Sequence, residues 1–243
     1  ELVLAIGNPF GVGQTVTNGI ISGLARTGIA SGSAKGYFLQ TDAPINPGNS
    51  GGALIDISGS LVGVNTSILS RSGGSNGIGF AIPADLVGQF LVQAKAGNSS
   101  FIRPWAGMRA QPITFEMAAS LNLPAMSGMI ISELHELSPF LKVGIGVGDI
   151  ITKVDGLDIN SPAEMLYRMS VVGIGTAVDV SYLSQGILKS SKIDLVEMPN
   201  WKANQVTLGP DFIFRDLNIS ELTPEFQSKF GLSFSSEGLI VLD

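Results

Sequence analysis

The sequence contains no cysteine, only one histidine and few charged residues. The lack of cysteine excludes disulfides and thiolate metal sites, and it leaves the redox compartment open because secreted proteins can also lack cysteine. One histidine and scattered carboxylates assemble no metal cluster at typical ligand spacing, so we expect neither a metal nor an organic cofactor. The net charge of −6, with no cluster of Lys and Arg, argues against nucleic acid as a partner.

Long apolar runs are also missing. No run approaches the roughly 20 residues that span a bilayer, although hydrophobic residues make up 44% of the 243 positions, a globular composition. The first residues, 1–7, have no basic region or cleavage site of a signal peptide. Both ends fall inside apolar runs, so we expect a piece of a longer protein, whose localisation a missing signal peptide does not reveal.

Residues 1–82 are rich in glycine and β-branched side chains, arranged as short apolar runs between turn signals. Many short strands with glycine-rich connections predict a sandwich or a barrel. Ser58-Gly59 is typical of a hairpin turn between two of the runs. The predicted strands lie at residues 16–24, 37–41, 53–57, 61–69 and 77–82.

From Pro83 the apolar spacing becomes helical and ends at Gly97-Asn98, before a polar linker. Residues 101–198 mix strands with short helices. The predicted helices lie at 115–121 and 162–169, the strands at 128–132, 149–154 and 177–183, and Asp155-Gly156 marks a tight turn. Residues from about 199 repeat this order, with 212–217, a helix at 224–230 and 238–242, which indicates a truncated internal repeat.

The motif that carries chemistry is Gly48-Asn49-Ser50-Gly51-Gly52. A serine hydroxyl that attacks a carbonyl creates an oxyanion, which needs backbone N–H donors beside it. Glycines let the substrate carbonyl approach that backbone. Ser50 is therefore the candidate nucleophile, and the N–H groups of Gly48 and Ser50 are the candidate oxyanion donors.

The bare Gly-x-Ser-x-Gly pattern also matches the nucleophile elbow of α/β-hydrolases. That elbow requires a helix after the serine, whereas a β-hairpin pattern follows Ser50. It also requires a later histidine, and the single candidate is His135, which lies between two glutamates. We expect His135 to be a solvated surface residue.

Several motifs in order resemble one protease family. Gly7-Asn8-Pro9-Phe10-Gly11, residues 15–22, residues 40–54 and residues 77–83 together closely resemble the HtrA (Deg) family of trypsin-like serine proteases, and the later segments resemble its PDZ domains. The resemblance implies a mainly β chain. Its parts would be the C-terminal half of a chymotrypsin-like double β-barrel (1–98), an α+β PDZ domain (99–198) and a truncated second PDZ domain (199–243).

The resemblance further implies an endopeptidase of the periplasm or cell envelope that degrades unfolded polypeptides without ATP, as a homotrimer or a larger homo-oligomer. Ser50 carries over as the nucleophile, and Gly48, Asn49 and Ser50 as the oxyanion loop. The family's catalytic histidine and aspartate lie upstream of Glu1, and Asp42 does not replace the latter. Without a general base the hydroxyl is a poor nucleophile, so we expect this chain alone to be inactive.

Two binding sites follow from the same resemblance. Ile68 and Leu69 would border the substrate pocket and favour small or medium apolar P1 residues, among regulatory loops at 27–36, 42–47 and 70–76. The loop that holds a peptide carboxylate would be Trp105-Ala106-Gly107-Met108, with helix 162–169 as the other wall of the groove and Arg103 attracting the carboxylate. The family more often has a larger aliphatic residue before the glycine.

A second hypothesis is a non-catalytic, PDZ-containing scaffold that binds peptides. The intact Gly-Asn-Ser-Gly-Gly motif favours the enzyme. A histidine and an aspartate on upstream barrel strands would distinguish the two.

Overall fold

The computed structural model describes residues 1–26, 37–68, 73–121, 123, 127–199, 205–209, 211, 213–214 and 216–242. Contacts divide the chain into two compact units. The first comprises Glu1–Arg103 with Ala163–Gly173, and the second comprises Pro104–Pro162 with Ile174–Asp243. Within the described part of the chain, no helix is both long and apolar enough to cross a membrane.

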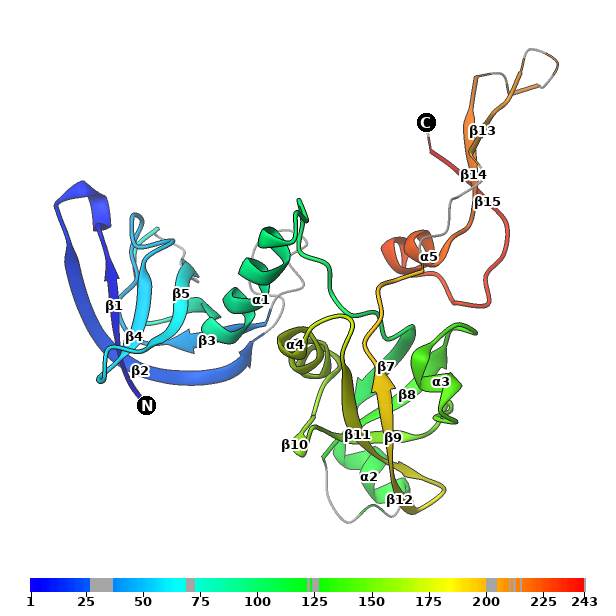
Figure 1. Cartoon of the computed structure of the whole chain (residues 1–243), viewed down its shortest axis with the longest axis horizontal. Coiled ribbons are helices and arrows are strands. Elements are labelled where there is room, and N and C mark those ends of the chain that lie inside the picture. Colours follow the sequence, from blue (N-terminus) through cyan, green and yellow to red (C-terminus); the bar gives the residue numbers. More distant parts are fainter. Residues whose placement is uncertain are drawn as a thin grey trace. The chain divides into compact units, whose positions relative to one another are not determined.

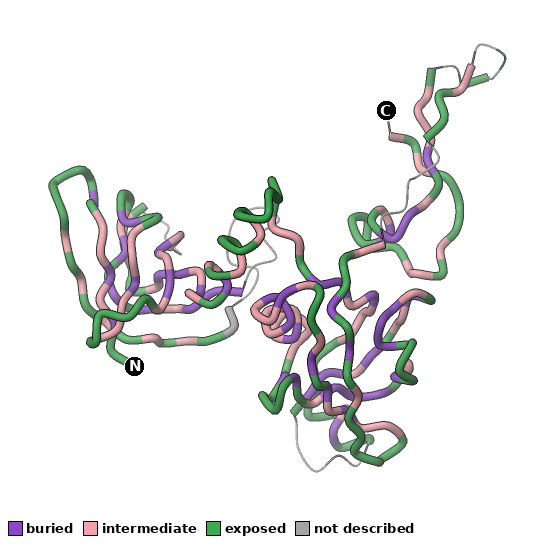
Figure 2. The backbone as a smooth tube through the Cα atoms, viewed as in Figure 1, coloured by how far each residue is buried: buried purple, intermediate pink, exposed green. Residues whose placement is uncertain are grey.

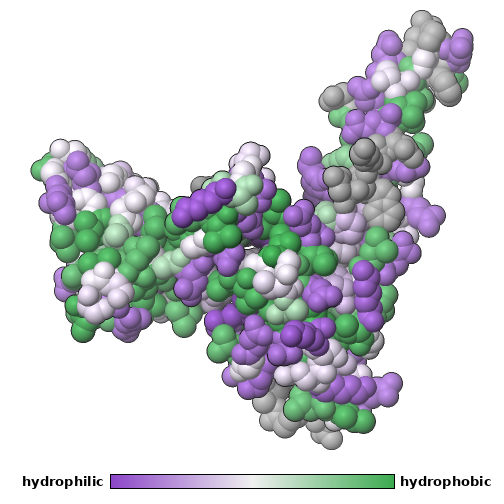
Figure 3. All heavy atoms as spheres, viewed as in Figure 1, coloured by the Kyte–Doolittle hydropathy of each residue, from purple (hydrophilic) through white to green (hydrophobic). Residues whose placement is uncertain are grey.

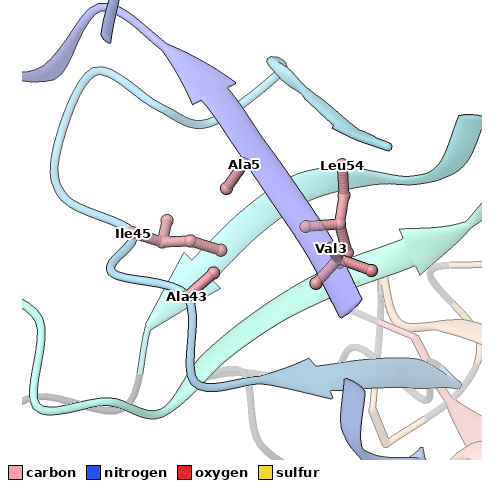
Figure 4. Packing of buried hydrophobic residues seen from close by; sticks show 6 residues of the cluster. Val3, Ala5, Ala43, Ile45 and Leu54 are labelled. Carbon is pink, nitrogen blue, oxygen red and sulfur yellow. The ribbon is translucent and has the colours of Figure 1, made fainter. Parts of the chain in front are cut away.

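The first unit contains a closed β-barrel (Figure 1), with strands in the order β1-β2-β3-β6-β5-β4. Alternate residues of β1 point inward, as expected for a strand with one buried face. The core of the barrel is a cluster of small and medium apolar side chains, shown in Figure 4: Val3, Ala5, Ala43, Ile45, Leu54 and Ala81. The strands are β1 (Leu2–Gly7), β2 (Thr15–Arg26), β3 (Phe38–Thr41), β4 (Ala53–Asp56), β5 (Leu61–Ile68) and β6 (Gly79–Pro83).

The predicted hairpin turn at Ser58-Gly59 is confirmed, because it joins β4 to β5. Gly59 has a φ of +84°, which glycine adopts without a side-chain clash. The Asp56 carboxylate accepts hydrogen bonds from the Ser58 hydroxyl at 2.6 Å and from the Ser60 N–H at 2.9 Å. These hydrogen bonds hold the pKa of Asp56 below its usual value, and the bond from the Ser58 hydroxyl has the largest effect.

Helix α1 (Ala84–Lys95) follows β6 directly. Pro83 was expected inside the first helical turn, but it is the last residue of β6 and the N-cap of α1. The barrel unit leaves large apolar side chains exposed, and hydrophobic colour covers much of its visible face in Figure 3. They include Phe10 on the short helix η1 (Pro9–Gly11) and five others: Val12, Val16, Ile20, Leu24 and Ile57.

The main sheet of the second unit has the order β12-β11-β9-β8-β7, with β10 paired to β9. Buried residues alternate with less buried ones along β8 and β11, and Figure 2 colours the buried residues of this unit purple. Asp155 and Gly156, with φ of +48° and +75°, form the predicted tight turn between β9 and β10. The strands are β7 (Met108–Pro112), β8 (Met129–Leu134), β9 (Ile150–Val154), β10 (Leu157–Asp158), β11 (Ala177–Ser184) and β12 (Ile187–Asp194).

The helices of this region also match the sequence predictions. Helix α2 (Phe115–Ser120) and helix α4 (Pro162–Val172) form where the spacing indicated them, and α4 runs three residues further than predicted. A short helix, α3 (Pro139–Lys142), is capped by Ser138. Residues 163–172 of α4, together with Gly173, group with the first unit.

The predicted internal repeat is visible as a second strand–helix–strand order. Strand β14 (Asn218–Glu221), helix α5 (Pro224–Phe230) and strand β15 (Leu239–Val241) correspond to β7, α2 and β8. Both helices have a threonine N-cap whose hydroxyl accepts a backbone N–H, from Met117 and Phe226 respectively. The strand expected at 212–217 lies instead at 218–221, and β13 (Gln205–Thr207), which pairs with it, was not predicted.

Candidate functional site

Ser50 lies in the loop between β3 and β4, which two turns and β5 hold in place. The Asn49 N–H donates to the Asn46 carbonyl at 2.9 Å, and the Gly52 N–H donates to the Asn49 carbonyl at 3.0 Å. Asn65 of β5 accepts from the Gly51 N–H at 2.8 Å and donates to the Gly52 carbonyl at 2.9 Å. A β-strand follows the serine, and this excludes the nucleophile elbow of an α/β-hydrolase.

The Ser50 hydroxyl is exposed and donates to the backbone carbonyl of Thr66 at 2.8 Å. A carbonyl oxygen accepts a hydrogen bond but takes no proton at neutral pH, so Thr66 is not a general base. Among the residues that the structure describes, no imidazole or carboxylate is bonded to this hydroxyl. The side chain is therefore presented to solvent without activation.

The backbone before Ser50 is held through its carbonyl groups. Gly48 has a φ of +104°. The Pro47 carbonyl accepts from the Phe10 N–H at 2.9 Å, and the Gly48 carbonyl accepts from the Asn8 N–H at 3.3 Å. With both carbonyls engaged by the 8–10 segment, the N–H groups of Gly48 and Ser50 have no acceptor in the described part of the chain. These two donors flank the nucleophile.

The Asn49 side chain anchors this loop to the barrel. It is buried, with 1% of its surface exposed, and it packs against the backbone of Gly7 in β1. A Cβ on Gly7 would lie 2.5 Å from the Asn49 Oδ1 atom, so only glycine fits there. The Asn65 side chain joins the strands beside it by donating to the carbonyls of Ile6 and Ala53, each at 3.2 Å.

Asp42, which is not expected to be catalytic, has a structural contact. Its carboxylate accepts from the Ile20 N–H of β2 at 2.6 Å. Ile68 is half-buried at the end of β5, where it pairs with Gly79 and packs against the barrel core. Leu69 lies outside the described residues.

The loop Trp105-Ala106-Gly107-Met108 leads into the edge strand of the second unit, whose first residue is Met108. Its carbonyls are used internally, because Ala106 accepts from the Ser138 hydroxyl at 2.7 Å and Gly107 accepts from the His135 N–H at 2.8 Å. The N–H groups of Ala106 and Gly107 have no acceptor among the described residues. Gly107 has a φ of +57°, and a Cβ there would lie 2.8 Å from the Trp105 ring.

Strand β7 begins at Met108 and ends the sheet. It pairs with β8 on one side, and no other described strand pairs with its outer edge. Free N–H and C=O groups along such an edge can accept an added peptide strand. The loop and the edge together have the form of a site for an extended peptide that ends at the loop.

Two protein families match these two regions. Residues 1–64 match the trypsin-like peptidase domain, and residues 110–195 match the PDZ domain. Relatives that match most of the chain include the probable periplasmic serine protease do/HhoA-like of Haemophilus influenzae, 41% identical over 196 residues, which are 80% of this chain and 42% of the relative. The periplasmic serine endoprotease DegP of Salmonella typhimurium is 36% identical over 94% of this chain and 47% of its own length. The chain is related to the HtrA (Deg) serine proteases.

A solved structure supports the same relationship. The HtrA-type protease AlgW with tripeptide is 38% identical and matches with a TM-score of 0.59, over 82% of this chain and 65% of the solved chain. The present chain thus spans less than half the length of the curated HtrA relatives given above. The predicted fold, a trypsin-like barrel followed by a PDZ domain, is confirmed.

The expected position of His135 was wrong. His135 is not a solvated surface residue, because 6% of its surface is exposed. Its ring meets the Trp105 ring edge-on at 5.4 Å between centroids and the Phe234 ring at 5.6 Å, while Nδ1 accepts from the Leu137 N–H at 3.1 Å. The flanking glutamates suggested exposure, but the chain turns after β8 and places the imidazole under Trp105. Arg103 is exposed.

Sequence reasoning also missed the supporting residues of the Ser50 loop. Asn8 donates to the Gly48 carbonyl, although it lies 40 residues before Gly48 along the chain. Asn65 bonds to the same loop and lies 16 residues after Asn49. Asn8 belongs to a motif that carried the family resemblance, and this was the available signal. No group of three or more metal-ligating side chains occurs within the ranges that the structure describes.

Proposed function

We propose that the full-length protein is a serine endopeptidase in which Ser50 is the nucleophile. The observation that carries this proposal is the pair of unengaged N–H groups, on Gly48 and Ser50, beside an exposed serine hydroxyl. The histidine and aspartate that activate the hydroxyl belong to sequence outside this chain. The chain by itself therefore hydrolyses peptides negligibly.

The reaction follows from the geometry of this loop. The hydroxyl leaves the Thr66 carbonyl, the base takes its proton, and Oγ attacks the carbonyl carbon of the substrate. Negative charge collects on the substrate oxygen, where the N–H groups of Gly48 and Ser50 stabilise it. The protonated base then donates its proton to the leaving amine, and water hydrolyses the acyl-enzyme in the same way.

The proposed domains are the barrel at 1–98, a PDZ domain at 99–198 and the beginning of a second at 199–243. Ile68 and Leu69 border the pocket for the P1 side chain and make it apolar. The substrates are unfolded polypeptides in the periplasm or cell envelope, cleaved by a homotrimer or larger homo-oligomer. Relatives named as periplasmic serine proteases support this compartment.

The PDZ domain binds peptide C-termini through Trp105, Ala106, Gly107 and Met108. The N–H groups of Ala106 and Gly107 donate to the terminal carboxylate, and the peptide adds as a strand to the outer edge of β7. Exposed Arg103 contributes positive charge.

Casein cleavage tests the enzymatic proposal. The full-length protein is expected to degrade unfolded casein without ATP, and the chain Glu1–Asp243 is expected to leave it intact. A full-length protein with no cleavage and no upstream histidine would instead support a peptide-binding scaffold.

Peptide binding is expected to depend on Gly107. In Gly107→Ala, the added Cβ would lie 2.8 Å from the Trp105 ring in a backbone of positive φ, so the loop must move. Affinity for a labelled peptide with a free C-terminus should fall about tenfold or more, measured by fluorescence anisotropy. The control is Gly156→Ala, also at positive φ but with open space around the new Cβ. Equal affinity for free and amidated C-termini in the parent would contradict the carboxylate site.

A further inference from the structure

Arg109 and Glu133 form an ion pair across β7 and β8. They are register partners, and Arg109 Nε lies 3.1 Å from Glu133 Oε2. Their side chains are half-buried, at 36% and 24% exposed. An isolated ion pair of this kind stabilises a protein little. Its structural role therefore depends on the other hydrogen bonds that the two side chains make.

Those groups hold the turn that follows helix α5, residues 231–234, here called the C-terminal turn. Arg109 donates from Nη1 to the Gly231 carbonyl at 3.2 Å and from Nη2 to the Leu232 carbonyl. Glu133 Oε1 accepts from the Phe234 N–H at 2.6 Å and from the Ser233 hydroxyl. The two side chains thus engage four consecutive residues, and we call them the clamp.

The clamp suits this turn chemically. The Gly231 and Leu232 carbonyls come at the C-terminal end of α5, where carbonyls lack helical partners and favour a cation. The planar guanidinium contacts both carbonyls while it lies 5.4 Å from the centroid of the Phe234 ring. Lysine offers no such fork.

The space between β8 and the segment after β14 is partly open. A cavity of about 970 Å³ lies between them, lined by residues of β8 and by residues 221–224 and 234–239. An interface with such an opening gains less from apolar packing than a filled one. The docking of the C-terminal turn therefore depends strongly on the clamp.

The clamp is also continuous with the loop 105–108. Arg109 directly follows this loop, and Glu133 lies two residues before His135, whose N–H binds the Gly107 carbonyl at 2.8 Å. A second path runs through aromatic rings, from Trp105 to His135 and from His135 to Phe234. The loop and the C-terminal turn therefore share His135 and the ends of β7 and β8.

We propose that the clamp docks the C-terminal turn on the sheet and that the turn and loop 105–108 gain and lose order together. The inference rests on the proposed peptide-binding function and extends it. The C-terminal turn, in the second PDZ-like segment, would help to fix the conformation of the carboxylate-binding loop. By reciprocity, a peptide bound at the loop also strengthens docking of the turn.

Amide hydrogen exchange in the chain Glu1–Asp243 tests this proposal without a peptide. Arg109→Gln and Glu133→Gln should each speed exchange about fivefold or more in residues 231–236 and also in residues 105–108. The control is Lys153→Gln, which removes an exposed ion pair with Asp158 in the same sheet and should change neither region. Exchange in the barrel strands, measured in the same samples, reports any general loss of stability.

Unchanged exchange in residues 231–236 would overturn the clamp. Faster exchange there with unchanged exchange in 105–108 would overturn the coupling, and so would an equal effect of Lys153→Gln. If the parent chain does not prefer a free C-terminus, the proposed peptide-binding function is wrong but the clamp proposal is unaffected, because hydrogen exchange is measured without a peptide.

Discussion

Ser50→Ala in the full-length protein is expected to lower casein cleavage by about 10⁴-fold or more. The substitution removes the atom that attacks the substrate, while binding and the oxyanion donors of Gly48 and Ser50 remain. Because the lost hydroxyl is exposed and makes one hydrogen bond, to Thr66, folding should change little. The measurement is kcat/KM on a fluorogenic peptide, beside the thermal midpoint of each protein.

The control for this change is Ser22→Ala, which removes an exposed serine hydroxyl on β2. It should keep full activity. Retention of substantial cleavage by Ser50→Ala, with the thermal midpoint unchanged, would mean that another residue is the nucleophile.

Gly48→Ala is expected to reduce kcat/KM by about 10²–10³-fold, the typical effect of removing an oxyanion donor. A Cβ at this position would lie 2.2 Å from the Asn8 carbonyl oxygen, and the residue has a φ of +104°. Both effects force the loop away from the 8–10 segment and turn the Gly48 N–H from its place beside Ser50. The loss should appear in kcat more than in KM, because the oxyanion forms during the reaction.

Gly59→Ala is the matched control for backbone strain. Gly59 also has a positive φ, of +84°, but nothing lies within 4 Å of its new Cβ in the β4–β5 turn. It should lower stability slightly and leave kcat unchanged. An equal loss of activity in both variants would show that strain, not the oxyanion loop, explains the Gly48 result.

The fold was predictable from the sequence where local signals decide it. Alternating apolar runs gave the barrel strands, and the turns at Ser58-Gly59 and Asp155-Gly156 were visible as dipeptides. Helix α5 was predicted from Pro224 onward, and its threonine cap repeats that of α2. Strand β14 lies at 218–221 rather than at the predicted 212–217, because its backbone pairs there with β13 and β15.

The site was predictable in its centre and not in its surroundings. Ser50 and its glycines form a contiguous motif, whereas Asn65 and Asn8 reach the loop through the closure of the barrel. The clamp depends on the register of β7 with β8. It also depends on hydrogen bonds between residues about 100 or more positions apart, such as the bond from the Phe234 N–H to Glu133. No local pattern carries such a contact, and His135 was misjudged for the same reason.

The most direct test of the central claim is covalent labelling of Ser50 with a fluorophosphonate. The nucleophilic oxygen would displace fluoride and form a bond to phosphorus, which mass spectrometry locates in the peptide that contains Ser50. The full-length protein should be labelled at Ser50, and the chain Glu1–Asp243 should not, because it lacks the base that activates the hydroxyl. A full-length protein that cleaves casein while Ser50 stays unlabelled would contradict the account.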